Sequence, residues 1–590
     1  MNYGFDEGKQ GLNRIHSEDS RQLLLQLEQL LGADRVVSDP KRNEHYRKGF
    51  RSGGGDALAV IFPQHLLHMW RALQACVDAG AIIILQAANT GLTEGSTPSG
   101  SDYDRPLVII NTLQMETIHL LEGGKQVVAL PGATLHRLEK LLTPIRRAPH
   151  SEIGSSCLGA SIVGGIANNS GGALCQRGPA YTELALFARV NERGELQLIN
   201  NLGIELGESP EEILTNLEHG TFIRVGQLPY SDNDRRPRTA SDRDYVARLR
   251  DVDADTPARF NADPRRLFET SGCAGKVAVF AVRLDTFPVP ERTQTFYIGS
   301  NDARVFSRLR RGLLSELPQI PILGEYLHRD MFDLAADYGR DSFYTIEKLG
   351  TRRMPKFFAL KGRVDAWLAK RSFLPRFLSD RLLQQFSKLL PQHLPQRMLD
   401  YRKKYDHHLI VKVADDAIEP ARSWLTAFFN ASENNGEFFA CTPTEASKAM
   451  LHRFVSAGAA MRYQAVHNKE VGELLPLDIA LRRNDQEWQE ELPAEIADQL
   501  EYRLYYGHFL CNVFHQDYIL KKGADVKQVK KAMLELLERR GACYPAEHNV
   551  GHLYQAPEAQ LKFFERLDPT NSFNPGIGKT DKTRRCCTCG

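Results

Sequence analysis

Two glycine-rich loops carry the residues best suited to hold a phosphate-containing ligand. The first loop, residues 86–98, reads QAANTGLTEGSTP, and the second loop, residues 154–172, reads GSSCLGASIVGGIANNSGG. Gly91 and Gly95 allow the backbone to approach a ligand closely, and free N–H groups in such a loop can surround a pyrophosphate. Either loop alone is commonly a tight structural turn. Together, about 65 residues apart in one domain, they favour a diphosphate-binding site.

A second group of residues could move protons. Gly507-His508 is followed seven residues later by His515, and Glu547-His548 lies about 30 residues beyond. Imidazole titrates near neutral pH, which suits it to general acid–base catalysis. A lone histidine is also commonly a buried ring with satisfied hydrogen bonds. The sequence therefore favours an active site only for the full set of four residues.

The elements that must position these groups follow an α/β pattern. Residues 57–62 and 82–86 are short apolar runs typical of strands, and residues 65–79 between them have helical periodicity. Residues 107–111 and 126–130 are further strand-like runs. Strands that alternate with helices, with turn residues between them, predict a mixed α/β domain with the first loop directly after a buried strand.

The composition excludes several classes of protein. Apolar residues make up 42% of the chain and charged residues 25%, which excludes a disordered, collagen-like or disulfide-scaffold chain. The longest apolar runs are far shorter than the roughly 20 residues of a transmembrane helix, and the first ten residues contain no apolar signal segment. Seven cysteines are scattered singly and are expected to be reduced thiols. Three others are expected to form a solvated tail: Cys586, Cys587 and Cys589.

Residues 351–404 differ from the rest of the chain in charge. They contain 14 lysines and arginines and three aspartates, a local net charge of +11, whereas the whole chain has +2 and the remainder therefore −9. Aromatic and aliphatic residues are interleaved with the cations. This composition favours an anionic membrane surface. Nucleic acid, whose phosphates the cations would neutralise, and a solvated helical hairpin with a basic face are the alternatives.

Several motifs resemble a known flavoprotein family. The two loops, together with DPTNSFNPG at residues 568–576, resemble the flavin-binding fold of the vanillyl-alcohol-oxidase type. The resemblance is closer to the bacterial quinone-dependent D-lactate dehydrogenases, and it extends from about residue 20 to Thr580. Four further motifs carry it: RKGFRS at 47–52, QRGPAYT at 176–182, FETSGCAG at 268–275 and AEHNVGH at 546–552.

The resemblance implies an α+β fold with three parts. An FAD-binding domain of two subdomains is joined to an α/β cap domain with an antiparallel sheet, and a mainly helical basic segment docks on the membrane. The expected boundaries are 1–285 for the FAD-binding domain (core about 53–224, completed by 555–590), 286–350 and 405–554 for the cap, and 351–404 for the membrane-binding segment.

The resemblance also implies the cofactor and its contacts. Covalent members of the superfamily attach FAD through a histidine or a cysteine. Neither loop contains a histidine, although Cys157 lies in the second loop, so non-covalent FAD is expected. The residues expected to contact it are Ala87, Ala88, Asn89, Thr90, Gly91, Gly95, Ser96, Gly154, Ser161, Gly171 and Val279.

The activity that the resemblance implies is respiratory oxidation of D-lactate to pyruvate. A hydride would pass to FAD and electrons to membrane quinone, in a peripheral protein held on anionic phospholipid at the cytoplasmic face of the bacterial inner membrane, without nucleic acid. Two alternatives stay open. One is a dehydrogenase of another 2-hydroxy acid, such as 2-hydroxyglutarate or glycolate. The other is a non-catalytic lipid- or nucleic-acid-binding protein on a degenerate flavin fold.

The same resemblance suggests roles for individual residues. His548 is expected to be the base that takes the hydroxyl proton. Arg453, in LHRF at 451–454, resembles the carboxylate-binding arginine of related dehydrogenases and offers a bidentate guanidinium. Arg329, in HRD at 328–330, is the second choice. A surface salt bridge is the alternative for either arginine.

The resemblance also implies a binding site for a divalent metal ion. Related flavin-dependent 2-hydroxyacid dehydrogenases hold one with two histidines and a glutamate, which correspond here to His508, His515 and Glu547. Imidazole and carboxylate ligands suit zinc or manganese. Residues 509–514 read FLCNVF, where those relatives have GDGN between the histidines. Without a metal, these histidines would bind the substrate carboxylate directly as hydrogen-bond donors.

Overall fold

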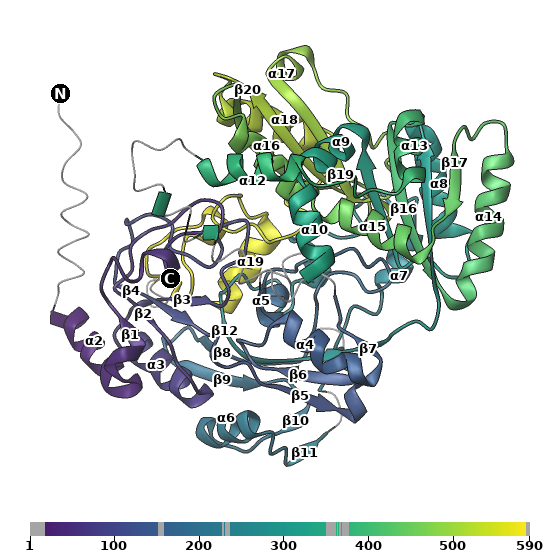
Figure 1. Ribbon diagram of the computed structural model, residues 1–590. Helices are drawn as coiled ribbons and strands as arrows, with labels where there is room; N and C mark the ends of the chain where they lie inside the picture. Colours follow the sequence, from purple (N-terminus) through teal and green to yellow (C-terminus); the bar gives the residue numbers. More distant parts are fainter. Residues whose placement is uncertain are drawn as a thin grey trace.

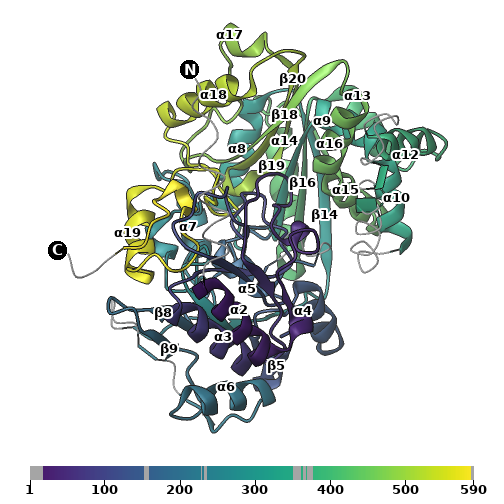
Figure 2. The same ribbon diagram turned by 90° about the vertical axis from the view of Figure 1, so that its left-hand side faces the viewer.

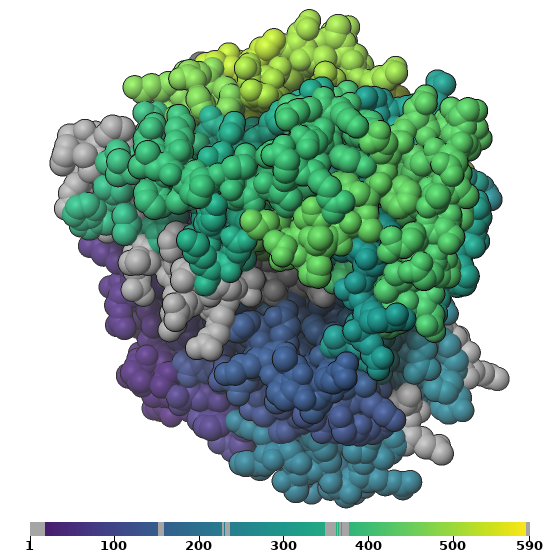
Figure 3. Space-filling model, turned by 45° about the vertical axis from the view of Figure 1, so that its right-hand side comes forward, coloured from purple at the N-terminus to yellow at the C-terminus, as the bar shows by residue number. Residues whose placement is uncertain are grey.

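The computed structural model describes residues 18–151, 159–226, 229–230, 236–349, 361–362, 364, 367–368 and 377–585. These residues form an N-terminal domain, to which the last described residues return, and a cap built around a separate sheet (Figure 1). Residues 287–288, which were expected in the cap, pair with residues 147–148 of the N-terminal domain. Figure 3 shows the cap, in teal and green, above the N-terminal domain, in purple and blue. Within the described residues, no helix is both long enough and apolar enough to cross a membrane.

The first sheet of the N-terminal domain places the first loop. Its strand order is β1-β2-β4-β3, and β2, β4 and β3 are parallel. Because α2 and α3 contribute to the apolar core beside the sheet, β3 and β4 are almost entirely buried. The first loop begins where β3 ends. The bounds are α2 Glu18–Leu31, β1 Val36–Val37, β2 Ala59–Ile61, α3 Leu66–Asp78, β3 Ile82–Gln86 and β4 Leu107–Asn111.

The second sheet of this domain is antiparallel, with strand order β5-β6-β12-β8-β9. Its inner face packs against α4 and α5, and α5 belongs to the second loop. The strands are β5 Ile118–Leu121, β6 Gln126–Ala129, β8 Ala185–Val190, β9 Leu196–Asn200 and β12 Ala278–Asp285. The helices are α4 Leu135–Leu142, α5 Ile162–Ala167, α6 Pro210–His219 and α7 Tyr245–Arg250. Two short ribbons complete the domain: β10 Ile204–Glu205 pairs with β11 Arg224–Val225, and β7 Arg147–Ala148 pairs with β13 Phe287–Pro288.

The chain returns to the N-terminal domain after the cap, drawn in yellow in Figure 1. Helix α19, Glu558–Leu567, packs in the core of the second sheet. Phe573 is fully buried and forms a parallel bridge with Ile83 in β3. The Asn574 side chain donates hydrogen bonds to the carbonyl oxygens of Gly95 (2.8 Å) and Ala274 (2.9 Å). This return therefore links the first loop to the segment that precedes β12.

The cap contains a seven-stranded antiparallel sheet with strand order β17-β14-β16-β15-β19-β20-β18. Alternate residues face opposite sides, so that Phe296 and Ile298 of β14 enter one core and Tyr297 enters the other. The strands are β14 Thr293–Ser300, β15 Leu323–His328, β16 His407–Ala414, β17 Glu437–Ala440, β18 Val471–Ala480, β19 Leu500–His508 and β20 Val513–Lys521.

Helices cover both faces of this sheet, which Figure 2 shows nearly edge-on. One face carries α8 Ala303–Ser315, α14 Ile418–Asn430 and α18 Val526–Arg539, with the short α17 Ala494–Ala497 beside α18. The other face carries α9 Arg329–Tyr338, α10 Arg340–Leu349, α12 Leu378–Lys388, α13 Gln396–Lys404, α15 Pro443–Phe454 and α16 Ser456–Val466. Each face is therefore an apolar core closed by amphipathic helices.

The segment predicted to dock on membranes, 351–404, is only partly described. Residues 351–360, 363, 365–366 and 369–376 lie outside the described residues. Within the described part, Leu394 and Met398 are buried in the cap core. Several of its cations form ion pairs with acids of other elements: Arg397 with Glu445, Arg402 with Asp333 and Lys404 with Glu437. Part of the local charge of +11 is thus neutralised by folding.

Candidate active site

A cavity lies between the two glycine-rich loops and is the candidate cofactor site. Its empty space of about 1040 Å³ includes volume that is open to solvent. Nine of the eleven residues predicted to contact FAD line it: Ala87, Ala88, Asn89, Thr90, Gly91, Gly95, Ser96, Ser161 and Val279. Gly154 and Cys157 lie outside the described residues, and Gly171 lies elsewhere, against Glu547.

The shape of the first loop fits a bulky ligand. Asn89 has a φ of 51°, and its side chain donates to the Lys48 carbonyl oxygen at 2.8 Å and accepts from the Ser96 hydroxyl at 2.8 Å. A Cβ atom added to Gly91 would meet no protein atom within 4 Å, so this glycine faces open space. The loop backbone is thus fixed beside the cavity, and a dinucleotide cofactor could approach it closely at Gly91.

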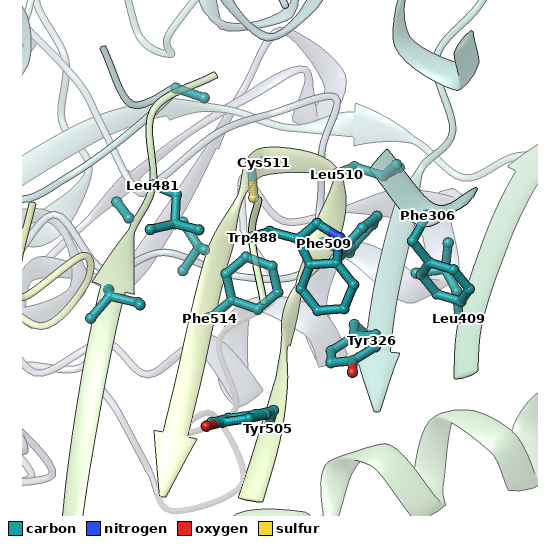
Figure 4. Packing of buried hydrophobic residues seen from close by; sticks show 14 of the residues in the cluster. Phe306, Tyr326, Leu409, Leu481, Trp488, Tyr505, Phe509, Leu510, Cys511 and Phe514 are labelled. Atoms are coloured by element: carbon teal, nitrogen blue, oxygen red, sulfur yellow. The ribbon is translucent and has the colours of Figure 1, made fainter. Parts of the chain in front are cut away.

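The two histidines of the candidate cluster lie on the hairpin between β19 and β20. Asn512, with a φ of 53°, closes the turn, and Phe509 and Phe514 pack with Trp488 in an aromatic cluster (Figure 4). The Trp488 and Phe514 rings are stacked, with 5.5 Å between their centroids and an angle of 6° between their planes. The FLCNVF segment therefore anchors the hairpin in the core. It leaves the Nε2 atoms of His508 and His515 3.4 Å apart.

A carboxylate lies beside Nδ1 of each of these histidines, and the one beside His508 is hydrogen-bonded to it. Glu325 Oε1 lies 2.6 Å from His508 Nδ1, and Asp478 Oδ1 lies 3.2 Å from His515 Nδ1. Both pairs follow from strand register, since Glu325 is opposite His508 across β15 and β19, and Asp478 is opposite His515 across β18 and β20. Because each Nδ1 faces a carboxylate, both Nε2 atoms are directed toward a common point.

Glu547 completes this cluster from the segment after α18. Its Oε2 lies 3.8 Å from His508 Nε2, and its Oε1 forms a buried ion pair with Arg259 Nη2 at 2.6 Å. Its backbone N–H donates to Asp478 at 2.7 Å. A Cβ atom at Gly171 would lie 1.8 Å from Oε1, so the absence of a side chain there makes room for the carboxylate.

The three predicted ligands fit a divalent metal ion. One donor atom from each of His508, His515 and Glu547 lies within 4.8 Å of the others. Two imidazole nitrogens bound at about 2.1 Å to one tetrahedral ion lie roughly 3.4 Å apart, which is the separation of the two Nε2 atoms here. Carboxylates on the distal nitrogens are the usual second partners of metal-binding histidines. The site therefore suits zinc or manganese.

Arg453 lies beside this cluster, whereas Arg329 does not. Arg453 is in the last turn of α15, and its Nη2 pairs with Glu325 Oε2 at 2.9 Å. Its guanidinium also lies over the Tyr506 ring, 4.7 Å from the centroid. Glu325 thus joins Arg453 to His508. Arg329 begins α9, is 39% exposed in its side chain and forms an ion pair with Asp406 at 2.7 Å.

His548 lines the cofactor cavity next to Glu547. It has a φ of 76°, and its carbonyl oxygen accepts a hydrogen bond from the Thr93 hydroxyl at 2.8 Å, so the first loop holds it. Burial lowers the pKa of His548 to about 4, although the charge of Asp478 opposes this. The imidazole is therefore neutral at pH 7 and can accept a proton.

Several residues of the site were not among the sequence-based candidates. Glu325 is the one acid of the apolar strand β15, Asp478 lies in the apolar second half of β18, and Arg259 lies in a loop. Burial raises the pKa of Glu325 to about 7, against the charge of Arg453, and that of Asp478 to about 6, against the charge of His548. A lone acid in an apolar strand was the available signal, because a buried carboxylate needs a partner.

Comparison with known proteins agrees with this arrangement. Residues 57–197 match the family described as "FAD binding domain", and residues 295–586 match the family described as "D-lactate dehydrogenase, membrane binding". The fold is similar to p-cresol methylhydroxylase (TM-score 0.57, 12% identity, 95% of this chain and 97% of that chain) and to 4-ethylphenol oxidase from Gulosibacter chungangensis (TM-score 0.55, 13% identity, 96% and 98%). These neighbours confirm the predicted vanillyl-alcohol-oxidase-type fold.

Closer relatives carry one name. The chain is 58% identical to the quinone-dependent D-lactate dehydrogenase of Escherichia coli (strain K12), over 97% of this chain and 99% of the relative. It is 54% identical to that of Haemophilus influenzae (strain ATCC 51907 / DSM 11121 / KW20 / Rd), over 96% and 99%. Both relatives are covered almost completely. The chain therefore belongs to the quinone-dependent D-lactate dehydrogenase family.

Proposed function

We propose that this protein oxidises D-lactate to pyruvate, with non-covalent FAD as the hydride acceptor and membrane quinone as the next electron acceptor. One observation carries the proposal furthest. His548 lines the cofactor cavity, and its neighbour Glu547 belongs to the cluster formed with His508 and His515. A proton acceptor, a candidate metal site and a flavin cavity thus meet at one point, as oxidation of a 2-hydroxy acid requires.

Arg453 is suited to hold the substrate carboxylate. One guanidinium nitrogen, Nη2, is paired with Glu325, and the buried Nε has no hydrogen-bond partner among the described residues. A buried donor without a partner is costly unless a ligand satisfies it. A carboxylate bound there would lie near the cluster, because Glu325 also contacts His508.

His548 is suited to take the hydroxyl proton of the substrate. Its position beside Glu547 in the cofactor cavity is the reason. Its imidazole is neutral at pH 7, because burial lowers its pKa to about 4, and this makes it a weaker base than a free imidazole, so that it depends on an acidified hydroxyl. Bound FAD would supply the acceptor for the α-hydride, so that the substrate loses one proton and one hydride and becomes a ketone. A divalent cation held by His508, His515 and Glu547 would acidify the hydroxyl. Arg259 would keep Glu547 in place for that cation.

The function is tested by anaerobic mixing with D-lactate, L-lactate, glycolate and D-2-hydroxyglutarate. D-lactate is expected to bleach the visible flavin absorbance fastest, and added quinone to restore it. His548→Ala should keep FAD but slow bleaching by at least about 100-fold. His136→Ala, which changes a surface histidine on α4, is the control. Faster bleaching by another acid would overturn the substrate assignment.

We further infer that the protein docks on anionic phospholipid at the cytoplasmic face of the inner membrane through α12. This helix has its polar and apolar faces reversed. Gln384 and Ser387 are buried, whereas Leu382, Phe386 and Leu389 are 62%, 57% and 82% exposed. Three exposed apolar side chains at spacings of four and three residues form one face, flanked by cations, which is the pattern of interfacial helices.

This docking is tested by sedimentation with phosphatidylglycerol vesicles. Burying three such half-exposed side chains contributes about 3 kcal/mol, or roughly 100-fold in binding. The triple variant Leu382→Ser, Phe386→Ser and Leu389→Ser is therefore expected to lose binding and to keep flavin reduction by D-lactate. Equal binding by the variant would refute the inference. The matched control changes three exposed residues of the N-terminal domain: Leu25→Ser, Ile223→Ser and Val225→Ser.

A further inference from the structure

Tyr506 contacts two functional groups of the candidate site. The Arg453 guanidinium lies over its ring, with 4.7 Å between Cζ and the ring centroid. The same ring lies beside the His515 imidazole, with 5.3 Å between the centroids and an angle of 42° between the planes. This second contact follows from strand register, because Tyr506 of β19 is directly opposite His515 of β20. One side chain therefore contacts both the carboxylate-binding candidate and a metal-binding candidate.

The Tyr506 ring is itself held in place. Its hydroxyl donates to Asp517 Oδ2 at 2.9 Å, and both residues are 5% exposed. Asp517 follows His515 by two positions in β20, so these two side chains are on the same face of the sheet. On the other neighbouring strand, β15, Leu327 is opposite Tyr506 and belongs to the same apolar core. A buried ring with a bound hydroxyl and a neighbour on each adjacent strand has little freedom to move.

Few other contacts hold the Arg453 guanidinium. Nη2 pairs with Glu325 Oε2 at 2.9 Å, and the buried Nε has no hydrogen-bond partner among the described residues. A contact through one nitrogen fixes the guanidinium plane less firmly than a bidentate pair would. An aromatic ring under that plane supplies the missing restraint, and its attraction for the cation is strongest where both are shielded from water, as they are here.

The relative position of these groups matters for a 2-hydroxy acid. The carboxylate and the hydroxyl of such a substrate are on adjacent carbons, so the groups that hold them must keep a fixed separation. Arg453 is suited to hold the carboxylate, and the cluster of His508, His515 and Glu547 is suited to act on the hydroxyl. Tyr506 contacts a member of each group.

We propose that Tyr506 is a positioning residue that aligns the Arg453 guanidinium with the metal-binding cluster and thereby selects acids whose hydroxyl is adjacent to the carboxylate. The assignment rests on the proposed function and extends it from the reaction to the choice of substrate. The ring has this role through its contacts with Arg453 and His515. The hydroxyl holds the ring in place through Asp517.

The test uses the neighbouring tyrosine as a matched control. Tyr505 is also buried, and its hydroxyl also donates to a carboxylate, that of Glu490, but it lies in the core on the opposite face of the sheet (Figure 4). Tyr506→Leu is expected to raise KM for D-lactate about 10- to 30-fold, with a smaller change in kcat. Tyr506→Phe keeps the ring and should stay within about threefold of wild type. Tyr505→Leu should lower the melting temperature but leave KM unchanged.

A second substrate analogue tests the selection itself. In 3-hydroxypropionate the hydroxyl is one carbon farther from the carboxylate, and this acid is measured as a competitive inhibitor. Its affinity should change less than about threefold in Tyr506→Leu, because the wild-type alignment does not fit it. An equal loss for D-lactate and for 3-hydroxypropionate would overturn the selective role.

A double-mutant cycle separates positioning from structural damage. In an Arg453→Met background no guanidinium is left to align, so Tyr506→Leu should have little further effect on kcat/KM. Additive effects in the cycle, or an unchanged KM in Tyr506→Leu, would overturn the proposal. FAD and metal content are measured for every variant. Tyr506→Met, which also lacks the ring but fills more of its space, replaces Tyr506→Leu in all these measurements if the leucine variant does not fold.

A binding measurement keeps this proposal separate from the proposed function. If D-lactate fails to reduce the wild-type flavin, the proposed function is wrong. Oxalate, which carries two adjacent oxygen-bearing carbons and cannot be oxidised by this route, is then titrated while the flavin spectrum is followed. Tyr506→Leu should weaken oxalate binding about 10- to 30-fold and Tyr505→Leu should not, whereas equal affinities in both variants would refute the role of Tyr506.

Discussion

Replacement of Gly171 by alanine tests whether the position of Glu547 controls the reaction. The new methyl carbon would lie 1.8 Å from Oε1 and 2.2 Å from Cδ of Glu547. Non-bonded atoms need about 3.5 Å, so the carboxylate must retreat by roughly 1.5 Å. Oε1 is the atom paired with Arg259 at 2.6 Å, and Oε2 is the atom nearest to His508. Both contacts should therefore be lost together.

The size of the effect follows from these contacts. Leaving one partner of a buried ion pair without its counter-charge costs about 3–5 kcal/mol, and a misplacement of about 1 Å in an active site can cost about 100-fold in rate. We expect kcat/KM for D-lactate to fall at least about 100-fold, equivalent to about 2.7 kcal/mol. FAD content should be retained, because Gly171 is not among the residues that line the cavity.

The assay is anaerobic flavin reduction by D-lactate, measured beside FAD content. Gly458→Ala in α16 is the matched control, because a Cβ atom there meets no atom within 4 Å. The double variant sharpens the test. In a Glu547→Ala background the colliding carboxylate is gone, so Gly171→Ala should have little further effect. A normal rate in the single variant, or full additivity in the double variant, would refute the reasoning.

Four further predictions follow from the same geometry. Arg453→Lys should raise KM for D-lactate at least about tenfold in steady-state kinetics, because one ammonium group cannot pair with Glu325 and also donate two hydrogen bonds to the substrate carboxylate. Elemental analysis should find about one zinc or manganese per flavin, and His515→Asn should lose it while keeping FAD. Truncation before residue 557 should abolish FAD binding, measured as flavin released on denaturation. Hydrogen bonds from Arg397 lower the pKa of Glu445 to about 2. The Glu445 carboxylate therefore stabilises the fold fully at a pH above its ordinary pKa, and this stabilisation is lost as the pH falls through about 2. The difference in melting temperature between wild type and Glu445→Gln should accordingly shrink in acid.

The buried strands were predictable because their apolar runs are continuous. The predicted runs 82–86 and 107–111 coincide with β3 and β4, and the run 126–130 exceeds β6 by one residue. Parallel strands that are covered on both faces have apolar residues at successive positions, so their sequence shows a continuous apolar run and not an alternation of polar and apolar residues. The helix predicted over 65–79 likewise differs from α3 by one residue at each end.

The partners within the candidate site could not be predicted in the same way. Glu325 meets His508 across 183 residues of sequence through strand register, and no local pattern encodes that pairing. The net charge of 351–404 in the folded protein could not be predicted from the segment alone either, since Arg397 and Arg402 form ion pairs with acids outside it. The FLCNVF segment differs from the residues that related dehydrogenases have between their histidines. Its aromatic residues anchor the hairpin in the core, which a pattern of ligands alone does not reveal.

The return of the chain to β3 has a consequence for biogenesis. Asn574 holds the first loop through a contact between residues 479 positions apart. During synthesis, most of the N-terminal domain emerges long before the residues that close the cofactor cavity, and the last elements of the cap, β20 and α18, emerge shortly before them. Domains generally fold in order of emergence, so the cap can be complete while the flavin loop still lacks its support. We therefore expect stable cofactor binding only after residues 573 and 574 have emerged, and we expect a chain that ends before them to fold its cap without a complete cofactor cavity.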